Sequence, residues 1–345
     1  MERIIINTRD SASEILVGAD WESAGEMIPA EGSVIITDDN MLRLYGEKFP
    51  DHPVLSVRPG EDSKKLRVIG QLAERLLDEG VDRNGFILGI GGGVVCDIAG
   101  FLASVYLRGV RCGYVSSSLL SQVDASTGGK NGVNLGGTKN IIGIIRQPEF
   151  VICDTRMLMT LPGEEYLSGL AELIKTAIIG DRELFEMIES NHTLIMKRDN
   201  DLLVDLVGRS VKFKAAVVTE DERETGLRRV LNFGHTFGHA IEMQTKVRHG
   251  FAVAAGMVLA TEFSAERGFI GQDVRKRILG LLHSFGYESY YGITHKRIEN
   301  LVRHDKKKSG SSLHFVFTAG IGKALIEKIP IGEVIDFYKR FIDKK

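Results

Sequence analysis

Residues 86 to 105 read FILGIGGGVVCDIAGFLASV, and this stretch sets the expected fold of the first half of the chain. It is long and apolar enough to suggest a membrane span, but Asp97 and five glycines lie in its interior. A buried strand, a glycine turn and a helix account for this composition better than a bilayer helix does. The stretch therefore predicts one strand–turn–helix unit of a parallel sheet.

Short β-rich runs on both sides of this unit alternate with helical periodicity, which is the pattern of a parallel sheet covered by helices. Between residues 66 and 77 apolar side chains recur at helical spacing, and Gly80 supplies a stop, so this segment predicts a crossover helix. The predicted strands are Ile4–Asn7, Val34–Thr37, Val54–Val57, Phe86–Ile90, Gly113–Ser116 and Val151–Asp154.

Beyond Pro162 the β-rich runs largely vanish and long amphipathic stretches follow. We expect a single later strand at Leu313–Phe317. The fold class is therefore α/β plus α, with a parallel-sheet domain over residues 1–158 and a mostly helical domain over residues 159–345. The predicted helical stretches of the second domain are 164–179, 199–219, 226–246, 251–267, 272–285 and 332–343.

The overall composition is that of an ordinary globular protein. Of the 345 residues, 43% are hydrophobic and 26% are charged, and the formal net charge is -2. Without a basic field, neither nucleic acid nor an anionic membrane is an expected partner. The start MERIIINTRD lacks the features of a signal peptide, and the three cysteines lack metal-ligand or disulfide spacing. These features predict a cytoplasmic protein.

A glycine-rich turn is the first candidate binding site. GIGGGVVCDIAG, residues 89 to 100, places three consecutive glycines where backbone N–H groups can approach a pyrophosphate. Gly89 and Gly91 fit the dinucleotide motif G-x-G-x-x-G, but Val94 stands at its third glycine position. A tight turn that needs positive φ explains the glycines equally well. Polar residues near other strand ends are further candidates for this site: Asp38, Asn40, Glu61 and Lys64.

Three histidines lie within fifteen positions in LNFGHTFGHAIEMQTKVRHG. His235 and His239 share a helix face at i and i+4, a spacing that suits a divalent cation such as zinc, and His249 follows closely. Glu172 is the candidate carboxylate, because it lies inside an otherwise apolar helix where a charge needs a partner. The alternative for Glu172 is an i,i+3 ion pair with Lys175 on a solvated face.

Cations gather in short polar motifs. In GGKNG and GTKN a lysine lies among small residues, which favours an anion close to the backbone. A solvated surface is the alternative for each cation, and it is the interpretation we favour for the run Lys306 to Lys308. Together with the glycine turn and the histidines, these motifs predict a small phosphorylated or carboxylated substrate. The candidate cations are Lys130, Lys139, Lys175, Lys214 and Arg228.

Five strings span most of the chain in order: GGGVVCDIAGF from Gly91, SLLSQVDASTGGKNGVN from Ser118, TKNIIG from Thr138, GLAELIK from Gly169 and RVLNFGHTFGHAIE from Arg229. They resemble the 3-dehydroquinate synthase family and, more broadly, the sugar-phosphate cyclases. The resemblance implies a Rossmann-like NAD-binding domain and a mostly helical metal- and substrate-binding domain, with the active site in the cleft between them.

The resemblance also implies ligands for each group. One divalent metal, usually zinc with cobalt as an alternative, would be bound by Glu172, His235 and His249, and His239 would contact substrate instead. NAD would be held by Asp38, Asn40, Glu61, Lys64, Gly92, Gly93, Val94, Asp97, Ser117, Ser118, Lys139 and Thr160. Substrate would be held by Asp124, Lys130, Asn140, Lys175, Lys214, Arg228, Asn232 and His239, with Lys306 as a further candidate.

The implied reaction converts 3-deoxy-arabino-heptulosonate 7-phosphate, a small phosphorylated sugar acid, to 3-dehydroquinate and phosphate. This is a lyase step of the shikimate pathway, which leads to the aromatic amino acids. It would proceed by transient oxidation with NAD, β-elimination of phosphate, reduction and intramolecular aldol closure. NAD would therefore be recycled rather than consumed. We expect a homodimer.

Other activities stay open on the sequence alone. A cyclase of the 2-deoxy-scyllo-inosose or 2-epi-5-epi-valiolone synthase type would act on a substrate that lacks the carboxylate. A metal-dependent polyol dehydrogenase of the glycerol dehydrogenase type would consume NAD stoichiometrically. A non-catalytic descendant would only bind a ligand or a partner. The intact GGK, TKN and GHTFGH strings argue against the last two.

The sequence departs from the family pattern at three places. Residues 116 to 118 are all serine where Pro-Thr-Thr is usual. His249 is usually followed by Gly-Glu, but Phe251 stands at the glutamate position and removes a carboxylate near a proposed metal ligand. We expect another group or water to replace it. The loop 305–310 is one residue shorter than usual, which leaves the role of Lys306 open.

Overall fold

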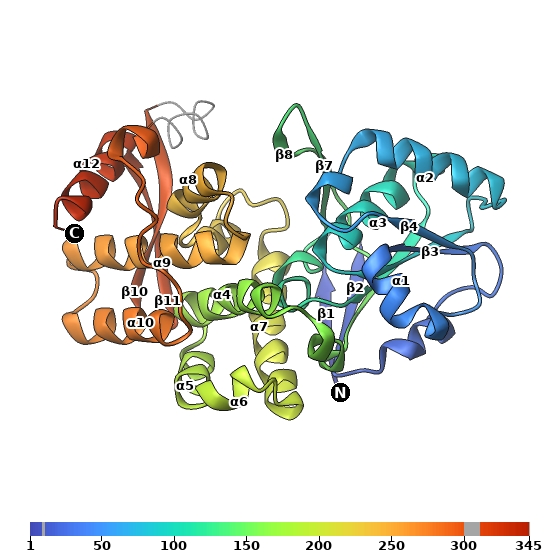
Figure 1. Cartoon of the computed structure of the whole chain (residues 1–345), viewed down its shortest axis with the longest axis horizontal. Helices are drawn as coiled ribbons and strands as arrows, with labels where there is room; N and C mark the ends of the chain where they lie inside the picture. The colour runs from blue at the N-terminus through green and yellow to red at the C-terminus, as the bar shows by residue number, and fades with distance from the viewer. Residues whose placement is uncertain (9–10, 300–310, 345) are drawn as a thin grey trace. The chain divides into compact units, whose positions relative to one another are not determined.

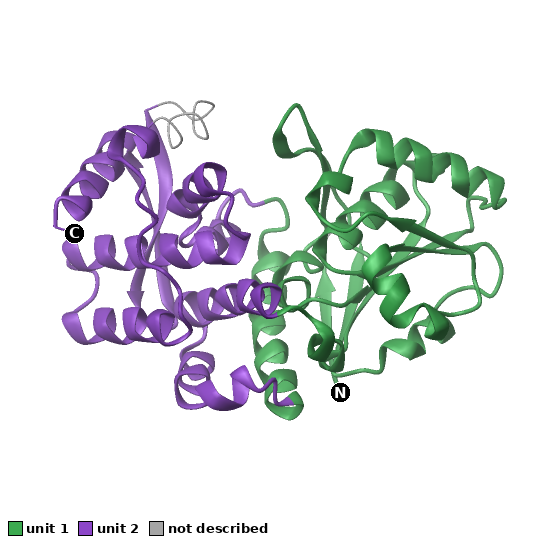
Figure 2. Ribbon diagram, viewed as in Figure 1, with its two compact units in different colours: residues 1–162, 200–223 green, residues 163–199, 224–345 purple. Residues whose placement is uncertain are grey.

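The computed structural model describes residues 1–8, 11–299 and 311–344 of the chain, which forms two compact units. Unit 1 comprises Met1–Pro162 and Asn200–Arg223, and unit 2 comprises Gly163–Asp199 and Glu224–Lys345 (Figure 2). The division into domains at residue 158 stays a prediction. The compact units differ from it mainly in the segment 200–223, which packs with unit 1 although the sequence grouped it with the later helices.

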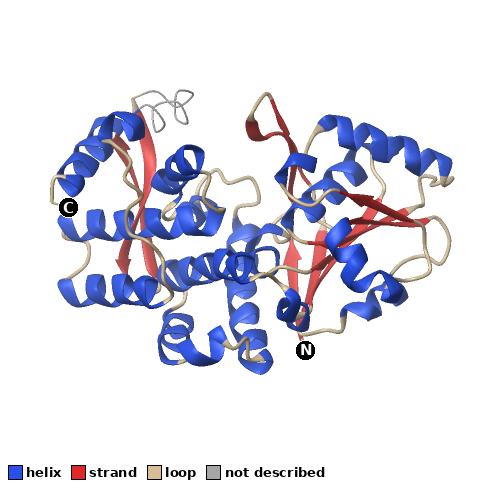
Figure 3. Ribbon diagram, in the orientation of Figure 1, coloured by secondary structure: helices blue, strands red, loops and turns tan. Residues whose placement is uncertain are grey.

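A seven-stranded sheet forms the centre of unit 1 (Figure 3). Its strand order is β1-β2-β9-β6-β5-β3-β4; β1 and β2 are antiparallel, and every other neighbouring pair is parallel. All six strands predicted for this half are present, and β2 was not predicted. The strands are β1 (Glu2–Asn7), β2 (Ala12–Val17), β3 (Ser33–Asp38), β4 (Val54–Val57), β5 (Phe86–Gly91), β6 (Arg111–Ser116) and β9 (Phe150–Cys153).

The helices of unit 1 are α1 (Asp39–Tyr45), α2 (Leu66–Asp78), α3 (Gly93–Val105) and α7 (Asn200–Glu220). They are joined by the short 3-10 turns η1 (Trp21–Met27), η2 (Gly46–Lys48), η3 (Glu61–Ser63), η4 (Tyr106–Arg108) and η6 (Thr155–Thr160), and by a π-helical turn η5 (Ser121–Ala125).

The residues 86–105 fold as predicted, into β5, a glycine turn and α3. Phe86 and Leu88 of β5 pack with Trp21 in a buried cluster on one face of the sheet. Gly89 points to the opposite face, where a Cβ would lie only 2.9 Å from the Cβ of Ala99 on α3. The missing side chain therefore permits the close packing of α3 on the sheet.

A two-stranded hairpin, β7 (Lys130–Leu135) and β8 (Thr138–Ile145), lies with β7 against α3, and its far end projects from unit 1 (Figure 1). Its strands are antiparallel, and Asn131 pairs with Ile144. The side chain of Asn131 is buried and accepts a hydrogen bond from Tyr114 Oη of β6 at 3.0 Å. The base of the hairpin is thereby anchored to the sheet. The sequence analysis predicted neither strand.

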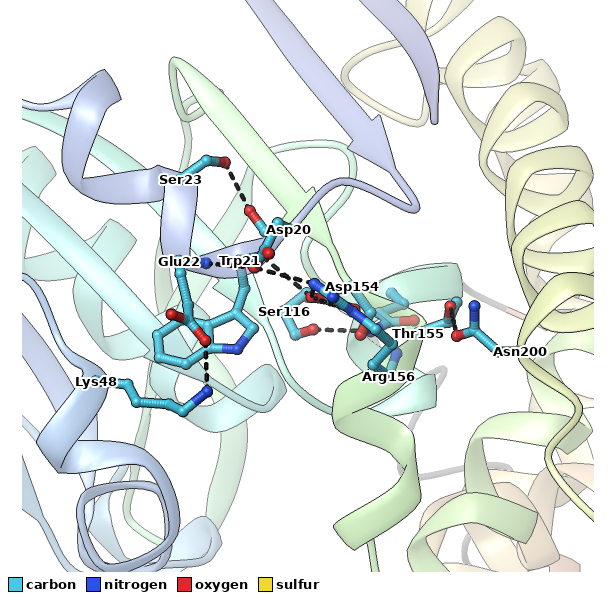
Figure 4. Close-up of polar contacts among 11 residues, drawn as sticks. Asp20, Trp21, Glu22, Ser23, Lys48, Ser116, Asp154, Thr155, Arg156 and Asn200 are labelled. Carbon is cyan, nitrogen blue, oxygen red and sulfur yellow. Dashed lines mark hydrogen bonds and ion pairs between the residues drawn. The ribbon is translucent and has the colours of Figure 1, made fainter.

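A polar network at the end of β9 fixes the start of α7 (Figure 4). The buried Asp154 carboxylate accepts hydrogen bonds from the backbone N–H of Trp21 at 3.1 Å and from Arg156 Nη2 at 2.6 Å. The next residue, Thr155, donates from its hydroxyl to Asn200 Oδ1 at 2.8 Å. Because Asn200 is the first residue of α7, the network ties this helix to the sheet.

Unit 2 is mostly helical, as predicted. Two details of the prediction are wrong. The single strand at Leu313–Phe317 is one arm of a hairpin, and the stretch 226–246 is interrupted at Gly234, whose φ of 78° is left-handed. The elements are α4 (Gly163–Gly180), α5 (Arg182–Ser190), α6 (His192–Met196), η7 (Leu227–Asn232), α8 (His235–Thr245), α9 (His249–Glu266), α10 (Gln272–Ser284), β10 (Ser312–Gly320), β11 (Lys323–Pro330) and α12 (Ile331–Ile342).

None of the helices in the described part of the chain is both long and apolar enough to cross a membrane. The one stretch of sequence that raised the question, residues 86–105, is divided between β5 and α3.

Candidate active site

Glycines bring three helices of unit 2 close together. A Cβ on Gly256 of α9 would lie 2.0 Å from the carbonyl oxygen of Gly234, just before α8. A Cβ on Gly250 would lie 2.0 Å from the carbonyl oxygen of Ser168 on α4. Larger residues at these two positions would push the helices apart. The glycines therefore allow the first residues of α8 and α9, His235 and His249, to approach the middle of α4.

Glu172, His235 and His249 form a candidate metal centre at this point. Their ligand atoms all lie within 4.8 Å of one another. Glu172 Oε1 is 3.6 Å from His235 Nε2 and 3.4 Å from His249 Nε2. Both oxygens of this buried carboxylate lack a well-aligned hydrogen bond from the described residues. Two imidazole nitrogens and one carboxylate are a ligand set that suits zinc.

The Nδ1 atom of each histidine also has a polar neighbour. His249 Nδ1 lies 3.0 Å from Glu242 Oε2, and His235 Nδ1 lies 3.2 Å from the carbonyl oxygen of Phe233. Such contacts fix the ring orientation and leave Nε2 free to face a metal. Glu242 thus contacts His249 as a carboxylate neighbour. Sequence reasoning missed it, although a glutamate seven residues after His235 on the same helix was an available signal.

Phe251 does not take part in this arrangement. Its ring packs edge-on against Tyr287, with the ring centroids 5.7 Å apart. It lies two residues after His249 on α9, and residues at i and i+2 do not share a helix face. The carboxylate that contacts His249 comes from Glu242 on α8, and the expectation that a group replaces a carboxylate at position 251 stays a prediction.

Burial and neighbouring charges shift the pKa values of Glu172, His235 and His249. Burial raises the pKa of Glu172, but Lys175 and both histidines outweigh it and hold the pKa well below its usual range. Burial and Lys175 lower the pKa of His235 to about 3, so this ring is neutral at pH 7. Burial lowers the pKa of His249, but the neighbouring carboxylates of Glu172 and Glu242 raise it to about 10. A cation must displace that proton to bind.

Lys175 and His239 border the candidate metal centre. Lys175 pairs with Glu172 as the i,i+3 alternative predicted, but both side chains are buried rather than solvated. The His239 ring lies at right angles to that of His235, with a centroid distance of 5.2 Å. His239 is not one of the three residues whose ligand atoms converge. The three converging residues are the set that the resemblance implies, and their role as metal ligands stays a prediction.

The glycine turn of unit 1 lies at the start of α3, where the first N–H groups of the helix are. Gly92 caps this helix without a side-chain hydrogen bond to its first N–H groups. A Cβ on Gly92 would lie 3.3 Å from Ser118 Oγ, and one on Gly93 would lie 3.0 Å from the Cβ of Ala125. Side chains at these two positions would be crowded, and the helix N-terminus behind the glycines is suited to a pyrophosphate. The chain therefore fits a dinucleotide here.

The other proposed NAD residues lie in several elements of unit 1, and some of them contact one another. Lys64 Nζ is 2.6 Å from Asp97 Oδ2, and Glu61 Oε1 accepts from Asn134 Nδ2 at 2.9 Å. Burial raises the pKa of Asp97 to about 6 despite Lys64. Asp38 caps α1, since its Oδ1 accepts from the N–H of Asn40 at 2.9 Å. Thr160 Oγ1 is 2.7 Å from Tyr45 Oη. Val94 lies on α3, Ser117 directly follows β6, and Lys139 lies on β8.

The proposed substrate residues are divided between the two units. In unit 1, Lys214 of α7 donates to the carbonyl oxygen of Asp124 at 2.6 Å and also pairs with its carboxylate. In unit 2, Asn232 donates to Glu224, a contact that the sequence analysis did not foresee. The remaining candidates in the described residues are Lys130 on β7, Asn140 on β8, Arg228 on η7, Lys175 on α4 and His239 on α8. Lys306 and the loop 305–310 lie outside the described residues.

Two family models match consecutive segments of the chain. The model described as 3-dehydroquinate synthase N-terminal matches residues 54–168, and the one described as 3-dehydroquinate synthase C-terminal matches residues 169–308. The chain belongs to the 3-dehydroquinate synthase family. The resemblance seen in the five sequence strings is thereby confirmed.

Curated 3-dehydroquinate synthases are similar to the chain along nearly its whole length. One from Dehalococcoides mccartyi is 38% identical over 342 residues, which cover 94% of this chain and 95% of that protein. One from Saccharolobus solfataricus is 37% identical over 342 residues, 92% of this chain and 96% of that protein. Membership of the 3-dehydroquinate synthase family therefore extends over both units.

Solved structures share the fold. A 2-epi-5-epi-valiolone synthase from Streptomyces hygroscopicus, with NAD+ and Zn2+ bound, has a TM-score of 0.89 at 23% identity and covers 98% of this chain and 99% of its own. A 2-deoxy-scyllo-inosose synthase complexed with carbaglucose-6-phosphate, NAD+ and Co2+ has a TM-score of 0.86 at 24% identity with the same coverage. At these identities the likeness concerns the fold alone, and it confirms the predicted α/β plus α class.

Proposed function

We propose that the chain is a 3-dehydroquinate synthase that converts 3-deoxy-arabino-heptulosonate 7-phosphate to 3-dehydroquinate and phosphate. The observation that carries the proposal is the match to curated 3-dehydroquinate synthases at 38% identity over 94% of the chain. A sugar-phosphate substrate is also consistent with the cyclases that share its fold.

The chain's own residues support the use of NAD and one divalent metal, with Glu172, His235 and His249 as metal ligands and the Gly92–Gly93 turn as the pyrophosphate site. When bound, NAD would accept and later return a hydride, and the metal would polarise the substrate hydroxyl that becomes a ketone. His235 is the neutral ligand, and Glu242 orients His249 through Nδ1.

The remaining residues of the site orient an anionic substrate and move protons. Lys130, Lys175 and Arg228 are the proposed anion-binding groups, since their ammonium and guanidinium groups are cationic hydrogen-bond donors. His239 lies beside the ligand His235 without sharing its role, so its imidazole can exchange a proton with substrate. Once the substrate hydroxyl is a ketone, the adjacent proton would be acidic, and its transfer to the imidazole of His239 would let phosphate leave by β-elimination.

A phosphate-release assay tests the proposal against its alternatives. We expect the purified, zinc-loaded protein to release phosphate from the heptulosonate phosphate without accumulation of NADH, because the hydride is returned within each turnover. The Glu172→Gln variant is the matched control and should release none. Phosphate release only from neutral sugar phosphates would favour another cyclase, and stoichiometric NADH would favour a polyol dehydrogenase.

We further propose that the protein acts as a homodimer in the cytoplasm. Three free, buried cysteines suit a reducing compartment. Two-fold homodimers are also the commonest soluble oligomers.

A further inference from the structure

Asn134, near the end of β7, forms hydrogen bonds to two separate segments, although neither the sequence patterns nor the resemblance assigned it a role. Its backbone N–H donates to the carbonyl oxygen of Lys64 at 2.7 Å, and its Nδ2 donates to Glu61 Oε1 at 2.9 Å. Its Oδ1 accepts from the backbone N–H of Asn140 at 2.8 Å. One half-buried amide therefore connects two segments that both contain proposed ligand-binding residues.

The first segment contains Glu61 and Lys64, which are both proposed NAD residues. Lys64 Nζ lies 2.6 Å from Asp97 Oδ2 on α3 and 3.6 Å from Glu61 Oε1. Lys64 and Asn134 thus hold one oxygen of the Glu61 carboxylate, and the side chain is still 38% exposed, so a ligand can reach it. Carboxylates in dinucleotide sites accept hydrogen bonds from ribose hydroxyls, so a fixed direction of this carboxylate favours NAD binding.

The second segment is a bulge in β8. The register of the hairpin shifts at Asn134, which alone lies opposite the three residues 139–141. Asn140, in the middle of this bulge, has a φ of 52°, a left-handed conformation that is unfavourable for a residue with a side chain. The hydrogen bond from Asn140 N–H to Asn134 Oδ1 offsets part of that strain. Bulges re-aim side chains next to ligand sites, and Lys139 and Asn140 are proposed NAD and substrate residues.

We propose that Asn134 is a positioning residue that orients Glu61 for NAD and, with the same amide, holds the bulge that presents Asn140. An amide suits this double role because it carries a donor and an acceptor side by side. An aspartate at this position would keep the acceptor and lose the donor, and a leucine of similar size would lose both. The inference rests on the proposed use of NAD.

Calorimetric titration of the full chain with NAD tests the orientation of Glu61. We expect Asn134→Asp to raise the Kd of NAD by about 10- to 100-fold, because it removes a hydrogen bond to a charged group and places a second carboxylate against Glu61. Asn84→Asp is the matched control, since it makes the same change at an exposed turn of unit 1 and should bind NAD like the wild type. Equal affinity in Asn134→Asp and the wild type would overturn the inference.

A second substitution separates positioning from general damage to the site. In the double variant Asn134→Asp/Glu61→Gln, the glutamine amide can donate to the aspartate, which restores the hydrogen bond with donor and acceptor exchanged. We therefore expect the Kd of NAD in the double variant to lie within about threefold of its value in Glu61→Gln alone. If the two single effects multiply instead, the side chains act independently and the positioning role is wrong.

Hydrogen exchange tests the bulge without NAD. The backbone amide of Asn140 should exchange about tenfold faster in Asn134→Leu than in the wild type, and at the wild-type rate in Asn134→Asp, which retains the acceptor. Unchanged protection of the β5 amides would show that both variants are folded. An Asn140 amide that exchanges at the wild-type rate in Asn134→Leu would mean that Asn134 does not hold the bulge.

These measurements require no turnover, so they separate the inference from the proposed reaction. A wild type that binds no NAD would overturn the proposed function and, with it, the role of Asn134 in NAD binding. A wild type that binds NAD but releases no phosphate from the heptulosonate phosphate would overturn only the proposed reaction, and the Asn134 variants would still decide the inference.

Discussion

A histidine that binds a metal through Nε2 depends on what holds its other nitrogen. For His249 that group is Glu242, which is 15% exposed and reaches Nδ1 from α8. Contacts of this type usually change metal affinity or activity by about 10- to 100-fold when they are lost. Glu242 is therefore the carboxylate on which the orientation of this ring depends.

We expect Glu242→Ala to weaken zinc binding by about 10- to 100-fold, and Glu242→Gln to weaken it less, because an amide oxygen still accepts the Nδ1 hydrogen bond. Competition with a chromogenic chelator would measure both affinities. Glu288→Gln, at an exposed position of the same unit, should bind zinc like the wild type. Equal affinity in Glu242→Ala and wild type would assign the orienting role to another group.

Alanine variants of His235 and His239 would show which of these two neighbouring histidines binds the metal. His235→Ala removes a nitrogen 3.6 Å from Glu172 Oε1, and we expect it to lose most of its bound metal together with activity. His239→Ala should keep its metal and lose activity, because its ring lies outside the group of converging ligand atoms. Elemental analysis of the dialysed variants separates the two. A similar metal loss in both would restore the i,i+4 ligand pair.

At the scale of elements, the glycines of two neighbouring helices have opposite roles. A Cβ on Gly100 of α3 would lie 2.0 Å from Tyr114 Oη and 2.1 Å from Asn131 Oδ1. A Cβ on the exposed Gly70 of α2 would meet nothing within 4 Å. The first glycine permits helix–sheet packing, and the second only adds freedom to the unfolded chain.

We therefore expect Gly100→Ala to lower the free energy of unfolding by about 1–3 kcal/mol, through overpacking. Gly70→Ala should raise it by about 0.5–1 kcal/mol, because alanine favours the helix and restricts the unfolded state. Urea unfolding followed by circular dichroism would measure both. A lower free energy of unfolding in Gly70→Ala would mean that the stability of α2 is not governed by helix propensity at this position.

The elements that sequence reasoning found are those with strong local patterns. β5 is buried at every residue, and α2 buries Ile69, Leu72 and Leu76 at helical spacing. β7 and β8 were missed because glycines, asparagines and lysines dilute their apolar pattern. The interruption at Gly234 was missed because it depends on the approach of Met257, which only tertiary structure supplies.

Local sequence patterns also predicted the candidate site only in part. Spacing alone indicated His235 with His239, since they are neighbours on one helix. The actual cluster draws Glu172, His235 and His249 from three helices, α4, α8 and α9. Residues far apart in sequence meet only through packing, so here the resemblance to a family predicted what local periodicity could not. The contact of Glu242 with His249 was predicted by neither.

At the scale of the whole molecule, α7 completes unit 1 although the chain reaches it only after the first helices of unit 2. Its buried residues include Leu203, Leu206 and Val211, and it packs on β1 and β2. A Cβ on Gly18 at the end of β2 would lie 3.1 Å from Val204 of α7. Unit 1 without this helix exposes apolar surface of its sheet.

We expect the fragment 1–162 to lack a cooperative unfolding transition, and the fragment 1–223 to show one, because only the longer fragment contains α7. Thermal unfolding followed by near-ultraviolet circular dichroism would distinguish them, with Trp21 in the unit 1 core as the reporter. A cooperative transition in the fragment 1–162 would show that the sheet is stable without α7.

The position of α7 in the sequence also decides when unit 1 can complete its folding during synthesis. The ribosome adds 61 residues between Pro162 and Arg223, which takes about 3–12 s at a typical rate of about 5–20 residues per second. Throughout that interval the nascent sheet presents an uncovered apolar face, while the segments of α4, α5 and α6 are being synthesised. The first unit of this protein therefore finishes folding only after the second has begun, and its dependence on chaperones should be greatest in those seconds.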